Sequence, residues 1–112
     1  MPEYGAAYYS LALLYAELGR DNEAIVQLEK ATKIMPKNTR VNYNLGLLYH
    51  KKQNFKKAEK SLILGLKTEA TNESLLYALA FVYSQSNQKE KAKNILHKLV
   101  GLYPNNQQYQ NF

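Results

Sequence analysis

The side chains best suited to acid–base or metal chemistry are two histidines, His50 and His97, and a carboxylate cluster of Glu17, Asp21 and Glu23. The histidines fall on different faces of different predicted helices, so they do not form the pair that a zinc site would need. The carboxylates straddle a predicted turn, where acidic side chains commonly lie at a helix start. No serine–histidine–aspartate arrangement, lysine nucleophile or glycine-rich phosphate loop can be drawn. We therefore predict no catalytic residue, no metal site and no cofactor, and we do not expect an enzyme.

The composition narrows the possible functions further. The 112 residues contain no cysteine, which excludes disulfide frameworks, thiolate zinc sites and cysteine nucleophiles. No apolar run approaches the roughly 20 residues of a membrane span, and no signal-peptide pattern opens the chain. The formal net charge is +6, most of it in residues 39–72, and a basic balance favours acidic partners.

Residues of the same type recur along the chain with a step of 34. The columns are Tyr9, Tyr43 and Tyr77; Leu11, Leu45 and Leu79; Ala12, Gly46 and Ala80; Tyr15, Tyr49 and Tyr83; Ala24, Ala58 and Ala92; Leu28, Leu62 and Leu96; and Asn38, Asn72 and Asn106. A shared register of this kind indicates a repeat protein. We therefore divide a single domain, 1–112, into repeats 5–38, 39–72 and 73–106, with 107–112 as the stub of a capping or further helix.

Each repeat is predicted to contain two helices. In the first, Tyr8, Leu11, Ala12 and Tyr15 follow the i, i+3, i+4, i+7 spacing of an amphipathic helix whose stripe faces the core. Glycine or a cap residue (Asp21 or Asn22 in the first repeat, Asn87 in the third) then separates this helix from the next. The predicted helices are 4–17, 22–35, 39–52, 55–68, 73–86 and 89–102. Small residues in the Ala12 and Ala24 columns should let the two helices approach closely.

These columns resemble the tetratricopeptide repeat, which has an aromatic residue at position 4, Leu at 7, a small residue at 8, Tyr at 11, Ala at 20, a small residue at 27 and Pro at 32. The first repeat matches throughout. The second has Asn42 at the aromatic position and Ala70 at the proline, and the third has Leu76 at the aromatic position and Leu99 where a small residue is usual. The resemblance implies an all-α fold, a right-handed α-solenoid of three helix-turn-helix repeats, with a role in protein binding.

A second face of each first helix offers a binding surface. Positions 2, 5, 9 and 12 cluster on one side at 100° per residue, away from the core-facing positions. In the family this side lines a concave groove. The predicted groove residues are Tyr9, Leu13, Arg40, Tyr43, Asn44, Leu47, His50, Lys51, Tyr77 and Phe81. Tyrosine rows of this kind suit peptide contact, although the same rings could serve only to pack neighbouring hairpins. Asn44 could likewise bind a ligand backbone or make a contact between repeats.

The leading hypothesis is therefore a scaffold that binds a peptide or helical segment of a partner protein, apolar with acidic character. A second, motivated by the abrupt start and end of the sequence, is an appendage of a larger enzyme or of a membrane or secretion complex that binds its own chain. A third is nucleic-acid or anionic-lipid binding through lysines on the convex face. Single-strand binders interleave basic and aromatic side chains, and here the lysines lie on second helices away from the tyrosine row. This distribution argues against nucleic acid.

The resemblance also bears on one class of partner. Chaperone-binding members of the family grip a C-terminal carboxylate through five polar residues, and the positions concerned are Tyr9, Leu13, Asn44, Ser74 and Ala78 in this chain. Only Asn44 matches. We therefore expect that the chain is not a carboxylate clamp for Hsp70 or Hsp90 tails.

The C-terminal end is expected to finish in a short helical stub over residues 107–112. Such a stub would leave part of the surface around Ile95, Leu99 and Leu102 exposed, because a solenoid needs a polar cap over its last repeat. Weak self-association through this end is the expected consequence.

Overall fold

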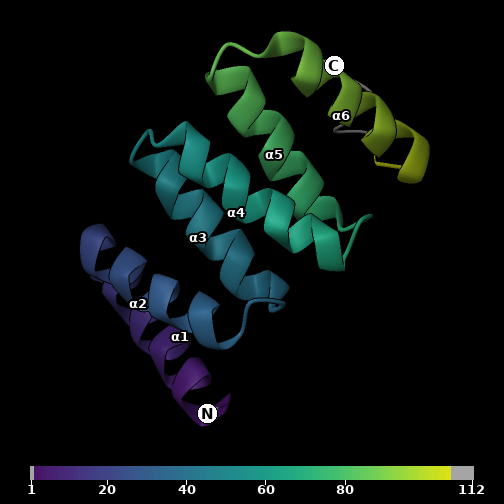
Figure 1. Cartoon of the computed structure of the whole chain (residues 1–112). Coiled ribbons are helices and arrows are strands. Elements are labelled where there is room, and N and C mark those ends of the chain that lie inside the picture. Colours follow the sequence, from purple (N-terminus) through teal and green to yellow (C-terminus); the bar gives the residue numbers. More distant parts are fainter. Residues whose placement is uncertain (1, 107–112) are drawn as a thin grey trace.

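The computed structural model describes residues 2–106, which form six helices arranged as a stack of hairpins (Figure 1). The helices are α1 (Pro2–Glu17), α2 (Asp21–Ile34), α3 (Thr39–Lys51), α4 (Phe55–Thr68), α5 (Glu73–Gln85) and α6 (Lys89–Leu102). Each first helix packs mainly on the second helix of its own hairpin, and α2 and α4 also pack on the first helix of the next hairpin. The prediction of an all-α solenoid of helix-turn-helix units is confirmed.

The turn inside each hairpin uses the same backbone conformation at equivalent positions. Gly19, Gln53 and Asn87, which are 34 residues apart, have φ angles of 76°, 62° and 65°. This left-handed region is natural for glycine and tolerated by asparagine, whereas for Gln53 the surrounding hairpin imposes it. The prediction that Asn87 caps the last helix is therefore wrong. Asn87 forms the turn, and Gln88 precedes α6 without a side-chain capping bond.

Asparagine caps define the helix starts of the middle of the chain. The side chains of Asn38, Asn54 and Asn72 each accept a hydrogen bond from the backbone N–H three residues further on, at 3.1, 3.3 and 2.9 Å. These bonds satisfy donors that the first turn of a helix would otherwise leave unpaired. Neither Asp21 nor Asn22 has this role in α2, because α2 already begins at Asp21.

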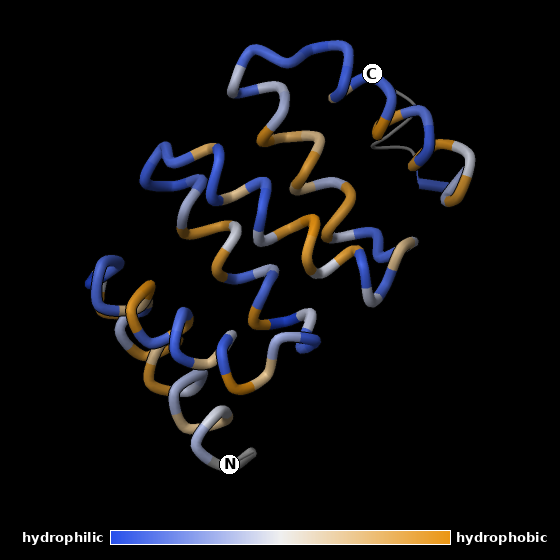
Figure 2. The backbone as a smooth tube through the Cα atoms, in the orientation of Figure 1, coloured by the Kyte–Doolittle hydropathy of each residue, from blue (hydrophilic) through white to orange (hydrophobic). Residues whose placement is uncertain are grey.

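The small-residue columns bring the helices of a hairpin together, as predicted. Ala24, Ala58 and Leu62 are fully buried. In the second hairpin a Cβ atom on Gly46 would lie only 2.7 Å from Cδ2 of Leu62, closer than a carbon–carbon contact allows. Figure 2 shows the apolar bands that recur along α5 within this core.

Helix α1 differs from the other first helices because no helix of the described chain packs on its outer face. Leu11 is 38% exposed, whereas Leu45 and Leu79 in the same column are 4% and 3% exposed. Those two leucines pack in the core cluster with residues of the preceding hairpin. Leu11 therefore does not join the core as its column predicts, because within residues 2–106 no hairpin precedes α1.

At the other end, the prediction of an exposed apolar surface on α6 is wrong in part. Leu99 is fully buried in a small cluster with Leu76, and Ile95 is half-buried beside it. Of the three residues, Leu102 alone is exposed, at 39%. Leu99 is large enough to pack on Leu76 of α5, so this side chain contributes no exposed apolar surface for self-association. The predicted stub at 107–112 lies outside the described residues.

Candidate functional site

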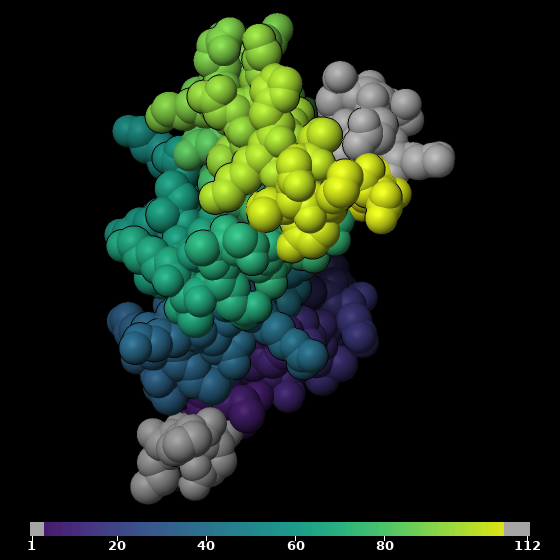
Figure 3. Space-filling model, turned by 90° about the vertical axis from the view of Figure 1, so that its right-hand side faces the viewer, coloured from purple at the N-terminus to yellow at the C-terminus, as the bar shows by residue number. Residues whose placement is uncertain are grey.

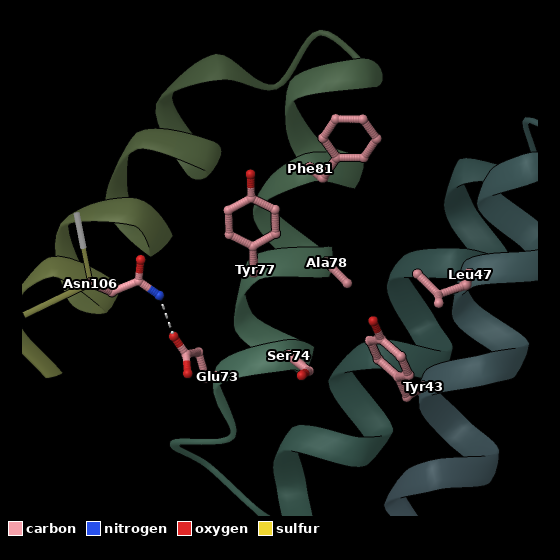
Figure 4. A pocket seen from close by; sticks show the side chains of 8 residues that line it. All are labelled: Tyr43, Leu47, Glu73, Ser74, Tyr77, Ala78, Phe81 and Asn106. Atoms are coloured by element: carbon pink, nitrogen blue, oxygen red, sulfur yellow. Dashed lines mark hydrogen bonds between the residues drawn. The ribbon is translucent and has the colours of Figure 1, made fainter. Parts of the chain in front are cut away.

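A pocket lies between α3 and α5 on the face that the first helices share (Figure 4). Its volume is about 470 Å³. The lining residues are Tyr43 and Leu47 from α3; Glu73, Ser74, Tyr77, Ala78 and Phe81 from α5; and Asn106 beyond α6. Four of the predicted groove residues thus meet in one cavity, and the remaining six lie outside it.

The walls of this pocket include apolar side chains that solvent reaches. Leu47 is 39% exposed and Phe81 is 48% exposed, and Leu13 continues the same line on α1 at 38%. Burying them against a partner would remove apolar surface from water at about 25 cal/mol per Å². An exposed strip of this kind is the feature that most often marks an interaction surface.

The three tyrosines of the predicted row, Tyr9, Tyr43 and Tyr77, are all half-buried. Tyr9 and Tyr43 are half-buried and pack against the core cluster. The Tyr9 hydroxyl accepts a hydrogen bond of 2.9 Å from Asn44 Nδ2, which also donates to the Arg40 carbonyl at 2.9 Å. The Asn44 amide nitrogen therefore joins α3 to α1, so the contact between repeats that the sequence left open is present.

Two of the basic groove candidates are engaged within the fold. Lys51 Nζ lies 2.9 Å from a carboxylate oxygen of Asp21, which links the end of α3 to the start of α2. The His50 ring is tilted against Phe55 and Phe81, with ring centroids 5.8 and 5.0 Å apart. His50 Nε2 is buried and has no hydrogen-bond partner among residues 2–106. Both residues therefore have structural contacts of their own at the rim of the groove.

Arg40 differs from these two. It is exposed and forms no ion pair within the part of the chain that the structure describes. It borders a second hollow, of about 150 Å³, between the starts of α3 and α5, together with Thr39, Tyr43 and Ser74. The starts of α3 and α5 lie beside it, and the partial positive charge at a helix start favours an anion.

Four residues of the main pocket are not among the predicted groove residues: Glu73, Ser74, Ala78 and Asn106. The Asn106 side chain donates a hydrogen bond of 2.9 Å to Glu73 and so closes one end of the pocket (Figure 4). Asn106 belongs to the Asn38 column, whose other members precede first helices. The column signals a repeat boundary, and no local pattern indicates that its last member turns back onto α5.

The convex face carries the predicted lysines, but its aromatic residues are not accessible. Lys57 and Lys91 place their ammonium groups 5.6 Å from the ring centroids of Tyr49 and Tyr83. Basic and aromatic side chains therefore do meet here, contrary to expectation. The two rings are only 7% and 8% exposed, so they offer no platform on which a base could stack.

The hydroxyls of these buried tyrosines face carboxylates of the preceding repeat. Tyr49 donates a hydrogen bond to Glu29, and burial together with this carboxylate raises the pKa of Tyr49. Burial, followed by the effect of Glu59, raises the pKa of Tyr83 to about 12. Both groups stay neutral at ordinary pH and join neighbouring hairpins, which makes this column architectural.

Within the described residues no group of three or more histidine, cysteine, aspartate or glutamate side chains is placed to hold a metal ion. None of the six helices is both long and apolar enough to cross a membrane, residues 1 and 107–112 being outside this search.

Comparison with solved structures identifies many of the same fold. The first TPR of Spaghetti (RPAP3), bound to HSP90 peptide SRMEEVD, has 20% identity and a TM-score of 0.89, covering 99% of this chain and 88% of that one. The second TPR domain of human RPAP3, in complex with HSP70 peptide SGPTIEEVD, has 16% identity and a TM-score of 0.89, covering 99% and 93%. MamA has 20% identity and a TM-score of 0.87. The match covers 94% of this chain and 61% of MamA.

These structures overturn the exclusion of Hsp70 and Hsp90 tails. Two of the neighbours hold such peptides on nearly the same backbone while sharing at most a fifth of their residues with this chain. The exclusion counted particular side chains at five positions, of which only Asn44 matched. A carboxylate requires donors and positive charge within reach, and another position of the same groove can supply them.

Comparison with family models covers most of the chain. A TPR repeat model matches residues 12–53, and tetratricopeptide repeat models match residues 39–72 and 74–106. No sequence among the curated proteins matches the chain. The matches to residues 39–72 and 74–106 agree with the second and third 34-residue repeats, and the chain belongs to the tetratricopeptide-repeat family.

Proposed function

We propose that the chain is a protein-interaction scaffold that binds an extended segment of a partner protein in the groove between α3 and α5. The observation that carries this proposal is the pocket of about 470 Å³ whose walls include the exposed Leu47 and Phe81. The groove has both an apolar wall and hydroxyl groups, from Tyr43, Ser74 and Tyr77. An extended peptide needs this combination, because it buries side chains while its backbone still requires hydrogen-bond partners.

The partner segment that fits best is apolar and ends in acidic residues. Arg40 supplies a positive charge at the hollow beside Tyr43, between the starts of α3 and α5. The two peptide complexes among the structural neighbours contain segments of this type, SRMEEVD and SGPTIEEVD. In this proposal the carboxylates lie near Arg40, and the preceding apolar residues lie along Leu47 and Phe81.

The test is a titration of the folded chain against fluorescently labelled SRMEEVD and SGPTIEEVD, followed by fluorescence anisotropy. Leu47→Ala and Phe81→Ala should each weaken binding by roughly 1–2 kcal/mol, or about five- to thirtyfold, as central contacts do. Ile63→Ala is the matched control, because Ile63 is also an exposed apolar residue, 37% exposed, but lies on α4.

The position of the carboxylate is tested by Arg40→Ala with the free and the C-terminally amidated peptides. The substitution should weaken the free peptide more than the amidated one. If neither peptide binds, or if the groove variants bind as well as Ile63→Ala, the groove is not the site for peptides of this type.

A further inference from the structure

Helix α1 has an apolar face that no part of the described chain covers. The exposed large apolar residues of this face are Tyr4 (58%), Leu11 (38%) and Leu14 (52%), and Leu18 (62%) follows directly after the helix ends. At 100° per residue the three helical positions fall within one stripe, away from Ala12, which faces α2. The helix carries no basic residue in its last turn, and its sequence is apolar on both sides. A helix of this kind is normally buried all round.

The same face is covered twice elsewhere in the molecule. Position 7 of the repeat is Leu11 in α1, Leu45 in α3 and Leu79 in α5, and position 10 is Leu14, Leu48 and Val82. In α5 both residues are only 3% exposed, because α4 packs on that side. In α3, likewise, α2 packs there. The chain therefore shows what this face accepts, which is the second helix of a preceding hairpin.

We propose that α1 of one copy packs on α6 of a second copy, head to tail, so that the junction repeats the contacts of α3 on α2 and of α5 on α4. The two helices form opposite ends of the stack, which measures 40 Å along its longest axis (Figures 1 and 3). The contact is heterologous, so each addition leaves the same two faces at the ends and the stack grows in a line.

Side-chain sizes at this junction are compatible. In the α4–α5 contact, Gly65 leaves a hole into which Leu75 fits, with a Cβ at Gly65 lying 3.0 Å from the Leu75 methyl. In α6 the equivalent of Gly65 is Leu99, whose side chain is fully buried and leaves no such hole. In α1 the equivalent of Leu75 is Ala7, a residue that needs no hole. A bulky side chain at Ala7 would have prevented the two helices from approaching.

The charges at the junction are complementary as well. The internal pair Lys51–Asp21 joins position 13 of one repeat to position 17 of the repeat before it. Across a head-to-tail junction the same two positions are Glu17 and Lys89. Both are exposed, and neither has an ion pair within residues 4–106. Each also opposes the dipole of its own helix, since Glu17 ends α1 and Lys89 begins α6, and pairing across copies relieves both.

The experiment is sedimentation velocity over a concentration series, with two charge reversals. The wild-type sedimentation coefficient should rise with concentration. Glu17→Lys and Lys89→Glu each place like charges at the junction and should weaken association by roughly three- to tenfold, and the double variant should restore it. Glu69→Lys and Lys37→Glu are the controls with the same changes in net charge, at exposed positions on neither α1 nor α6.

An apolar substitution tests the α1 face directly. Leu14→Lys should abolish association, while Val26→Lys, a change at a 46% exposed residue of α2, should leave it unchanged. A wild-type chain that stays monomeric throughout the series overturns the proposal. So does association that saturates at a dimer and responds to Leu14→Lys but not to Lys89→Glu, because that result indicates a symmetric α1–α1 contact.

Discussion

Substituting the same leucine in two repeats measures what a neighbouring hairpin contributes to stability. Leu11 and Leu45 occupy one column of the repeat, yet they are 38% and 4% exposed. Replacing a buried leucine with alanine typically costs about 3–5 kcal/mol, partly through the cavity that remains. Leu45→Ala should therefore cost about 3 kcal/mol. Leu11→Ala should cost about 1 kcal/mol, because its methyl groups already contact water and the site closes without a cavity.

The difference of about 2 kcal/mol is large against the total stability of a domain of this size, about 5–15 kcal/mol. It should appear as a melting temperature roughly 8–16 °C lower for Leu45→Ala than for Leu11→Ala, since 1 kcal/mol shifts the melting temperature of such a domain by about 4–8 °C. Urea unfolding followed by circular dichroism gives the two free energies of unfolding. Low micromolar protein keeps association from masking the exposed site.

Leu79→Ala is the internal control, because Leu79 is 3% exposed and should behave like Leu45→Ala. Equal losses for all three variants would refute the reasoning, since they would mean that Leu11 is as buried in solution as the other two. Equal losses that appear only at high protein concentration would instead agree with a second copy covering α1.

Three further expectations concern two glycines, the buried Tyr83 and the convex lysines. Gly46→Ala should destabilise the chain by about 1 kcal/mol, because the added methyl meets the buried Leu62. Gly101→Ala should stabilise it by about 0.5 kcal/mol, because no atom lies within 4 Å of the new Cβ. Thermal unfolding measures both changes in stability. The pKa of Tyr83 is raised by burial and Glu59 from 10.0 to about 12, so stability present below pH 10 should be lost as pH rises through about 12, and Tyr83→Phe should flatten that part of the stability–pH curve. Binding of RNA to the convex lysines should be weak and should vanish with salt; tight binding at physiological ionic strength would contradict the burial of the tyrosines beneath them.

The repeat register, the helices and the family follow from the sequence alone, because they depend on spacing. A step of 34 residues with an i, i+4 stripe states which face of each helix is buried, whereas the caps at Asn38 and Asn72 were seen only in the structure. The exposed line of Leu13, Leu47 and Phe81 follows from the same geometry, since positions 100° apart on a helix fall on a known face.

The tertiary structure alone decided where equivalent positions of the repeats have different environments. Leu11 has the residue type of a core position and lies exposed, because burial at that position comes from the hairpin before it. Lys51 and His50, predicted to line the groove, contact Asp21 and Phe81 of neighbouring hairpins, and His50 also contacts Phe55 of its own hairpin. Side-chain partners of this kind depend on distances between helices far apart in sequence. A column of identical residues describes the average environment of a repeat, and only packing determines the environment of each copy.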